Sequence, residues 1–356
     1  MSKQKLPELQ VFSGIAILCV VLIHSNAYYL SNVLNLQAYT DAKFIVRLLD
    51  NFIHGGVQMF IFIAGYKYAL NNIDEQYKNY AIKKLESVIK PFLIISIIFF
   101  VRNIILNLEY FNSISIIATF KLLTKQFINI FIGYNVAYHL WYIPMYLFIV
   151  LTYPIIYRLF KNDKLRVLII ITVIYAQRKL GINNFNFFKH PFDFVYFYLF
   201  FEMGVIFCKY DIKDKIKKWN VKIICIYIVA AIVLTINPIP KLYGLIQTYL
   251  LWPFCAVAYY LLSLKLVNNK LLKYLGKYSF YIFLLHEPII CTKMSSILKS
   301  TGNYNSIIYV LINAVLTIIC TMIVYKIIEK TFLKNILFNK DKKSVQLAEK
   351  EFEISI

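Results

Sequence analysis

The residues best suited to acid–base chemistry in this 356-residue chain are its five histidines. An imidazole titrates near neutral pH, so it can take a proton from a hydroxyl group, which is a poor nucleophile while it keeps that proton. His24 lies near the end of an apolar stretch that begins at Leu9. An ionisable side chain inside such a stretch is costly unless it faces a cavity or a polar partner. We therefore predict a functional role for His24, with a structural histidine as the alternative.

The other four histidines fall into two groups. His139 precedes two aromatic residues of the kind that anchor helices at a membrane interface. His286 is followed by Glu287 within an apolar stretch, where the two side chains need polar company. His54 and His190 stand at the ends of apolar stretches, and we interpret both as interfacial side chains bonded to water.

Two further ionisable residues, Arg102 and Glu202, stand inside apolar stretches. Burying either one without a partner would be expensive, so the two are candidates for an intramembrane ion pair. A pair that holds helices together and a pair that belongs to a site both fit this pattern, and the sequence leaves the choice open.

The six cysteines offer little chemistry. All of them lie in or at the ends of apolar stretches, with no CxxC motif and no Cys/His spacing that suits zinc. We therefore interpret them as small buried apolar side chains and predict no metal.

The composition identifies the kind of element that must position these residues. The chain is 60% hydrophobic and only 16% charged, which is too apolar for a soluble domain of this length. Its formal net charge of +21 comes from basic clusters between apolar stretches, a pattern that suits anionic lipid headgroups and not nucleic acid. Disorder and a soluble enzyme on one anchor are excluded, because apolar stretches run through nearly the whole chain.

These stretches predict an all-α, polytopic membrane protein with about ten transmembrane helices. A helix needs about 20 residues to cross a hydrocarbon core of about 30 Å. The stretches lie at residues 9–30, 52–70, 91–108, 138–157, 166–181, 192–208, 222–237, 245–264, 275–292 and 305–327. The first is long for a signal peptide and has no small-x-small cleavage site after it, so we expect it to be a span.

The basic residues favour one orientation of these ten spans, because cytosolic loops carry an excess of Lys and Arg. With the N-terminus inside, the predicted cytosolic loops are 71–90, 158–166, 209–222 and 265–277. Together with both ends of the chain, these loops hold 27 of the 39 basic residues, and the opposite loops hold 10. We therefore predict that both termini are cytosolic, which places all five histidines in the outer half of the membrane or beyond it.

One stretch, residues 113–133, is expected to lie along the membrane interface. Lys121, Lys125 and Asn129 recur there every four residues and give an otherwise apolar helix one polar stripe. An extra span at this point would also place the later basic loops outside the cell.

The spans are expected to form one membrane domain over residues 1–334, followed by a charged cytosolic tail at 335–356. The chain has no internal repeat and no glycine-rich phosphate loop. This argues against an inverted-repeat transporter and against a nucleotide-driven pump.

Six segments, in order along the chain, resemble the family 3 integral-membrane acyltransferases. They are GIAILCVVLIH ending at His24, GGVQMFIFIAGY from Gly55, KKLESVIKPF from Lys83, HLWYIPMYL from His139, FEMGVIF from Phe201 and LGKYSFYIFLLHEP from Leu275. Members of this family transfer acyl groups to sugars of cell-surface polysaccharides and to other acceptors. The resemblance covers most of the chain.

The resemblance implies an enzyme of the cell membrane that uses acyl-CoA as its donor substrate and holds no bound cofactor. A small acyl group, acetyl or succinyl, would pass from cytosolic acyl-CoA to a hydroxyl of an extracytoplasmic polysaccharide, as in O-acetylation. His24 is then the expected catalytic base. His139, His286 and Glu287 are candidates to orient this base or to polarise the thioester carbonyl.

The donor side departs from the family pattern. Family members commonly carry an Arg eleven residues before the histidine of the first helix, where this chain has Ser13. The basic motif before the third helix is reduced here to Lys83, Lys84 and Lys90. The resemblance implies that these lysines, with Arg102, bind the phosphates of acyl-CoA.

Two alternatives to an enzyme remain at this stage. The first is a polysaccharide exporter or carrier, in which the outer histidines and the many aromatic residues contact sugar without chemistry. The second is an acyltransferase-like sensor that lost its activity together with the missing Arg. For the enzyme, the expected partners are acyl-CoA, a cell-surface or capsular glycan as the acceptor, and membrane lipids, and nucleic acid is not among them.

Overall fold

The computed structural model describes residues 6–36, 43–71, 73–130, 137–179, 191–236, 244–302, 306–331 and 334. Every regular element in these ranges is a helix, which confirms the all-α prediction. The longer helices are α1 (Pro7–Tyr28), α2 (Phe44–Ile53), α3 (Gly56–Asn71), α4 (Tyr77–Leu106), α6 (Ile116–Ile130), α7 (Tyr142–Leu159), α8 (Asp163–Lys179), α9 (Pro191–Lys209), α11 (Asn220–Ile236), α13 (Trp252–Lys265), α14 (Lys270–Leu285), α15 (Cys291–Ser300) and α16 (Ser306–Glu329). The short helices and turns are η1 (Tyr29–Val33), α5 (Leu108–Ser113), η3 (Tyr138–Trp141), α10 (Ile212–Ile216), η4 (Lys217–Trp219), η5 (Gln247–Leu251) and η6 (His286–Ile290). The predicted tail at 335–356 and His190 lie outside the described residues.

Seven helical stretches among the described residues are long and apolar enough to cross a membrane. They are Pro7–Val33, Phe44–Asn71, Tyr77–Leu106, His139–Leu159, Ile212–Ile236, Gly244–Lys265 and Ile307–Glu329. The chain is therefore an integral membrane protein with several spans. The other three predicted spans fall on α8, α9 and α14, which have 17, 19 and 16 residues. The total of ten spans and their orientation remain predictions.

The predicted cytosolic segment at 71–90 is largely helical, and the helix of the third span begins earlier than the predicted span at 91–108. Helix α4 begins at Tyr77 and continues for 30 residues through the buried Pro91. Lys and Glu are good helix formers, so a charged stretch next to a span can continue the helix. The three lysines proposed for donor binding therefore lie on the first half of one rigid helix.

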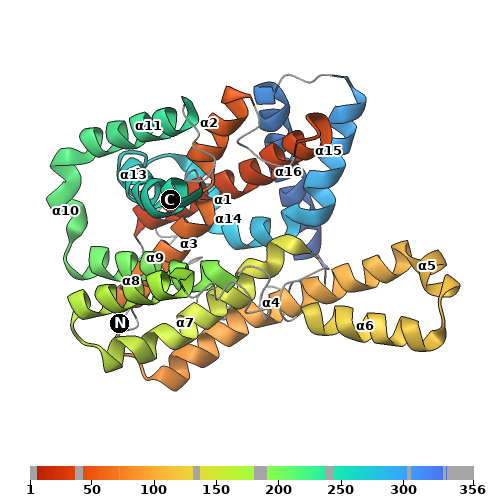
Figure 1. The fold of residues 1–356 in the computed structure, drawn as a ribbon, viewed down its shortest axis with the longest axis horizontal. Coiled ribbons are helices and arrows are strands. Elements are labelled where there is room, and N and C mark those ends of the chain that lie inside the picture. Colours follow the sequence, from red (N-terminus) through yellow and green to blue (C-terminus); the bar gives the residue numbers. More distant parts are fainter. Residues whose placement is uncertain are drawn as a thin grey trace.

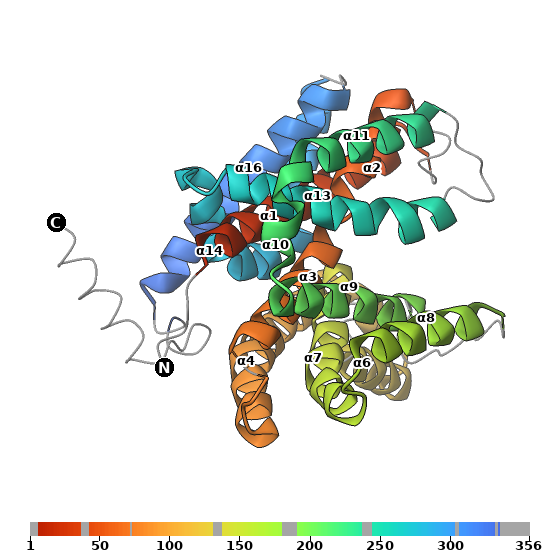
Figure 2. The same ribbon diagram turned by 90° about the vertical axis from the view of Figure 1, so that its left-hand side faces the viewer.

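The helices form two groups that meet at α3 (Figures 1 and 2). In one group, α1 packs against α13, α14 and α16, with α2 and α11 beside them; the other group contains α4, α7, α8 and α9. Helix α3 packs against α1 on one side and against α9 on the other. The apolar core continues through both groups, from Ile17 and Val21 of α1 to Phe200 of α9.

Glycines bring the central helices into backbone contact. A Cβ atom added to Gly14 would lie 2.1 Å from the carbonyl oxygen of Leu272, and one added to Gly276 would lie 1.8 Å from that of Gln10. Helices α1 and α14 therefore touch at a point where only glycine fits, as small residues allow in membrane bundles. Gly65 of α3 and Gly204 of α9 make the same kind of contact. These glycines fix the positions of α1, α3, α9 and α14.

An arm made of the second half of α4, α5 and α6 projects from the body (Figure 1). Helix α6 covers most of the stretch predicted to lie along the interface and is not among the seven candidate spans. It packs back on α4, where Asn103 Nδ2 donates to Gln126 Oε1 at 3.2 Å and the Phe100 and Phe127 rings are 5.9 Å apart. Lys121 and Lys125 are exposed. The interfacial location of α6 remains a prediction.

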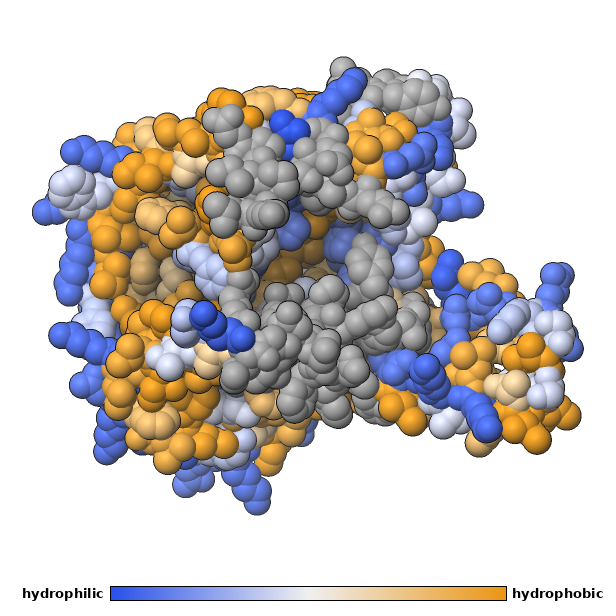
Figure 3. All heavy atoms as spheres, viewed as in Figure 1, coloured by the Kyte–Doolittle hydropathy of each residue, from blue (hydrophilic) through white to orange (hydrophobic). Residues whose placement is uncertain are grey.

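The surface agrees with a membrane location. Apolar residues cover most of the described surface seen in Figure 3, and hydrophilic residues gather at its margins. Large apolar side chains on α8, α11 and α16 face outward, among them Leu168, Val229 and Ile319, with 60%, 58% and 50% exposure. Such helix faces are stable against lipid and costly against water.

Candidate active site

His24 occupies the last turn of α1, where its side chain is half-buried. At 1.5 Å per residue it lies about 26 Å along the helix from Pro7. The imidazole of His286 is its neighbour, with the two ring centroids 5.0 Å apart. The packing of α1 against α14 thus brings together two histidines from opposite ends of the chain.

His286 stands where α14 is interrupted. The next residue, Glu287, has an extended backbone (φ −123°, ψ 158°), so α14 ends there and α15 starts after the short turn η6. Nδ1 of His286 lies 3.0 Å from the carbonyl oxygen of Ile282 and 2.8 Å from that of Phe283. Carbonyl oxygens only accept hydrogen bonds, so Nδ1 carries the hydrogen and Nε2 of the neutral ring is an acceptor. Nε2 is buried, and no described residue hydrogen-bonds to it.

His139 completes a group of three imidazoles. It lies on the short turn η3, is 2% exposed, and its ring centroid is 5.3 Å from that of His286. Phe99 of α4 and Phe283 of α14 pack around it at 6.3 and 5.6 Å. We call His24, His139 and His286 the histidine centre. The structure therefore assembles three residues that the sequence offered separately.

The Glu287 side chain contacts the end of α1. Its Oε2 accepts a hydrogen bond of 3.1 Å from the Tyr28 hydroxyl, which also lies 2.6 Å from Oγ1 of Thr292. Glu287 is fully buried, and a buried carboxyl group needs such donors. This contact fixes the chain immediately after His286.

His54 belongs to a second polar group, and our interpretation of it as a water-bonded interfacial residue did not include its carboxylate partner. Its Nδ1 lies 2.7 Å from Oδ1 of Asp50, one helical turn earlier, and its ring stacks on Trp252 at 4.9 Å. Asp50 is 2% exposed, so the pair sits at the edge of the protein interior. The spacing of Asp50 and His54, four residues apart, is the signal that could have revealed this pair from sequence.

The predicted donor lysines lie apart from the histidine centre, on the first half of α4. Lys83 pairs with Glu75 and is exposed, as is Lys90. Lys84 is half-buried, with Nζ 3.5 Å from the hydroxyl of Tyr146 on α7.

A series of aromatic contacts continues from Lys84 toward the histidines. Tyr146 packs on Tyr142 at 5.7 Å, and Tyr142 on Phe283 at 5.2 Å. Phe283 in turn contacts both His139 and His286. Lys84 is thus connected to the histidine centre through packed rings.

The predicted pair of Arg102 and Glu202 does not form, and this prediction was wrong. Arg102 is exposed on α4, whereas Glu202 is fully buried and binds Arg166 of α8 through two hydrogen bonds of 2.9 and 3.0 Å. Tyr153 of α7 donates to the same carboxylate. Depth along a helix cannot show which face a residue occupies, and Arg166, the true partner, stands at the edge of a predicted span.

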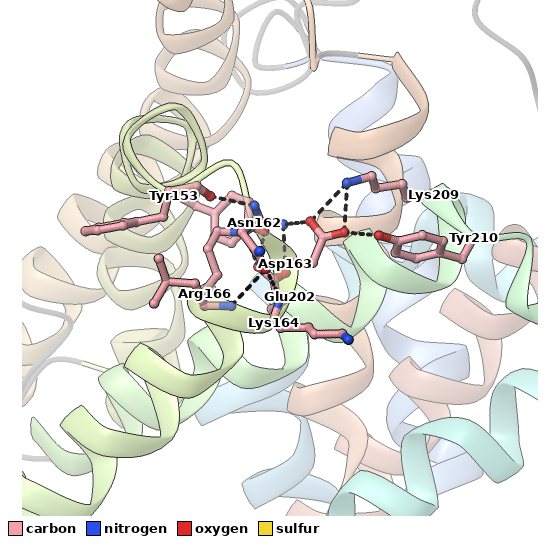
Figure 4. Close-up of polar contacts among 10 residues, drawn as sticks. Tyr153, Asn162, Asp163, Lys164, Arg166, Glu202, Lys209 and Tyr210 are labelled. Carbon is pink, nitrogen blue, oxygen red and sulfur yellow. Dashed lines mark hydrogen bonds and ion pairs between the residues drawn. The ribbon is translucent and has the colours of Figure 1, made fainter.

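Asp163 extends this network (Figure 4). Arg166 also binds Asp163, whose carboxylate accepts from Lys209 at 2.7 Å and from the Tyr210 hydroxyl. Every charge in the group has an opposite partner, so the group ties α7, α8 and α9 together and is fully satisfied.

The segments predicted to face the cytosol meet at this end of the molecule. Glu8 at the start of α1 pairs with Lys213 of α10 at 3.4 Å. Arg158 at the end of α7 donates to the carbonyl oxygen of Glu75, before α4, at 3.0 Å. The predicted orientation requires these segments to lie together on one membrane face, where the basic residues are concentrated.

The fold and this arrangement describe a polytopic membrane protein with a histidine centre between its helices. The family model described as an acyltransferase domain matches residues 6–326. The chain therefore belongs to the acyltransferase 3 family and is a membrane acyltransferase, as the six segments implied. No curated protein and no solved structure matches the chain.

Proposed function

We propose that the protein transfers a small acyl group, acetyl or succinyl, from cytosolic acyl-CoA to a hydroxyl of an extracytoplasmic cell-surface polysaccharide at the cell membrane. The observation that supports this best is the histidine centre. Three imidazoles from α1, η3 and η6 meet, two of them almost fully buried. Acyl transfer to an alcohol needs a base for the hydroxyl proton and donors for the developing oxyanion, and imidazoles can supply both.

In this proposal His24 is the base. It takes the proton of the acceptor hydroxyl as the oxygen attacks the thioester carbonyl, and the new C–O bond forms. The C–S bond then breaks, and the proton passes to the thiolate of coenzyme A. Atoms and charge balance without a bound cofactor.

His286 is proposed to orient His24. Because Nδ1 of His286 is held by two backbone carbonyls, its Nε2 can accept an N–H of the neighbouring ring. With one nitrogen of His24 held in that bond, its other nitrogen would act as the base. His286 would then orient the base, as the third group of a catalytic triad does. His139 is proposed to donate to the thioester oxygen, and Glu287 with Tyr28 keeps η6 in place.

Lys83, Lys84 and Lys90 are proposed to bind the phosphates of acyl-CoA at the cytosolic end of α4. Their charge suits phosphate, and the packed rings from Tyr146 to Phe283 lead toward the thioester site. Arg102 is left out of this donor site, because it faces outward on the projecting part of α4.

The test uses purified full-length protein in lipid nanodiscs with radiolabelled acetyl-CoA or succinyl-CoA and a cell-surface glycan fraction. The expected result is label in the glycan, released by mild alkali as an ester would be. Lys121→Gln on the projecting arm is the matched control and should keep wild-type activity. A preparation that hydrolyses acyl-CoA but labels no glycan with either donor would reject the proposed acceptor class.

A further inference from the structure

A second polar group lies close to the histidine centre and has no part in the proposed chemistry. It consists of Asp50, Asn51, His54, Gln247 and Trp252, which we call the outer cluster. Its residues come from the end of α2, the residue after it, and the η5–α13 segment. In the predicted topology this is the extracytoplasmic end. Helix α2, which carries Asp50 and Asn51, packs against α1, which carries His24.

The outer cluster fixes the orientation of the His54 ring. The Asp50 carboxylate is 2% exposed, and its Oδ1 lies 2.7 Å from Nδ1 of His54. Its other oxygen accepts from Gln247 Nε2 at 2.8 Å, and that same nitrogen lies 3.0 Å from Oδ1 of Asn51. Asn51 in turn donates to Thr235 of α11 at 2.9 Å. A carboxylate only accepts hydrogen bonds, so Nδ1 carries the hydrogen toward Asp50, and Nε2 is an acceptor when the imidazole is neutral.

Trp252 adds a flat apolar surface and an unsatisfied donor. Its ring lies parallel to that of His54, with 1° between the planes. Its Nε1–H is buried, and no described residue accepts its hydrogen bond. A buried N–H without a partner is costly, which is a reason to expect a ligand atom or water there.

We propose that the outer cluster is the acceptor subsite, which binds a sugar ring of the glycan next to the hydroxyl that is acylated. The indole packs on the apolar face of a sugar, and the acceptor Nε2 and the donor Nε1–H suit hydroxyl groups, which both donate and accept. This inference rests on the proposed function. It assigns His54, Asp50 and Trp252 to acceptor binding and leaves proton transfer to His24.

The experiment separates transfer from hydrolysis. Labelled acetyl-CoA is given to the nanodisc protein with increasing amounts of the cell-surface glycan fraction, and both labelled glycan and free acetate are measured. His54→Gln, which keeps a donor toward Asp50, should raise the glycan concentration for half-maximal transfer about tenfold or more. Hydrolysis of acetyl-CoA by water should stay within about twofold of wild type. Trp252→Phe keeps the stacking ring without the N–H and should raise that concentration about threefold.

Trp219→Phe, on the exposed η4 turn at the predicted cytosolic end, is the matched control and should change neither product. A wild-type glycan dependence in His54→Gln and Trp252→Phe would overturn the subsite while leaving the proposed function intact. An equal loss of transfer and hydrolysis in both would assign the cluster to folding and also overturn it. If His54→Gln is poorly folded, Trp252→Phe decides alone. A wild-type protein that labels no glycan would reject the proposed function itself.

Discussion

The imidazoles of His24 and His286 lie with their centroids 5.0 Å apart, although the two residues are 262 positions apart in the 356-residue sequence. The two backbone bonds to Nδ1 of His286 decide how this pair can work, because they make its Nε2 an acceptor. In the proposed mechanism, His24 turns one nitrogen to His286 and the other to the substrate.

His24→Gln should lower acyl transfer by about 100-fold or more, because glutamine keeps a hydrogen bond but takes no proton at neutral pH. The measurement is the initial rate of acyl transfer at varied concentrations of acyl-CoA and of glycan. Protein abundance and thermal stability should stay close to wild type. His24→Ala should be equally inactive.

Substantial activity in His24→Gln would make His24 a structural residue and move the base to His139 or His286.

His286→Gln is the informative companion. If His286 only orients the base, this variant should lose activity less severely than His24→Gln, with transfer depending differently on pH.

Replacing Lys83, Lys84 and Lys90 together by Gln should raise the acyl-CoA concentration needed for half-maximal rate far more than the glycan concentration. In the proposed donor site, the lost interactions are charge-assisted contacts to phosphate. A variant with Lys121 and Lys125 replaced by Gln carries almost the same change in charge on α6 and should behave as wild type. Equal effects on donor and acceptor would instead indicate a folding defect, and no effect would place the donor site elsewhere.

Glu202→Gln should destabilise the protein by up to about 3–5 kcal/mol, because it removes one of the two carboxylates, Glu202 and Asp163, that neutralise the buried Arg166. Thermal unfolding in detergent reports the loss. Replacing Arg166 by Met in the same chain should recover part of it, since the double variant buries no unpaired charge. A single variant as stable as wild type would show that the pair contributes little.

Asp163 should make stability depend on pH in the acid range. Burial alone raises the pKa of Asp163, but hydrogen bonds from Lys209, Tyr210 and Arg166 outweigh it and hold the pKa below its ordinary value. A lowered folded-state pKa contributes stability above the unfolded value near 3.8, and this is lost as pH falls through the folded value. The melting temperatures of wild type and Asp163→Asn should differ by a constant amount from pH 5 to 8, and this difference should shrink as pH falls below about 3.8. A difference that stays the same down to about pH 2 would contradict this origin.

Lys215→Cys should be labelled by a membrane-impermeant maleimide only after cells are permeabilised. Lys215 is exposed on α10, in the segment that pairs with the start of α1 and carries much of the basic excess. Labelling in intact cells would invert the topology and, with it, the cytosolic site for acyl-CoA.

The sequence could supply the members of the histidine centre but not their arrangement. His24, His139 and His286 stand out singly, because an imidazole in an apolar stretch is expensive. Their meeting depends on the backbone contact of α1 with α14, which no local pattern encodes. The predicted partner of Glu202 was wrong for a related reason. Counting residues along a span gives the depth of a residue in the membrane but not the face of the helix on which its side chain lies. The Asp50–His54 pair is a local, one-turn feature and could have been predicted.

The glycine contact between α1 and α14 gives the histidine centre a mechanical sensitivity. Gly14 precedes His24 by the same ten residues as Gly276 precedes His286, so both rings sit about 15 Å beyond the point where the helices touch. If one helix tilted by about 5° relative to the other at this contact, its histidine ring would move by about 1.3 Å. A displacement on this scale can slow a well-aligned reaction about 100-fold. In the proposed mechanism, small changes in helix tilt, including those imposed by a thinner or thicker bilayer, would then change the rate of acyl transfer. The glycine contact that transmits the change lies away from the reacting groups.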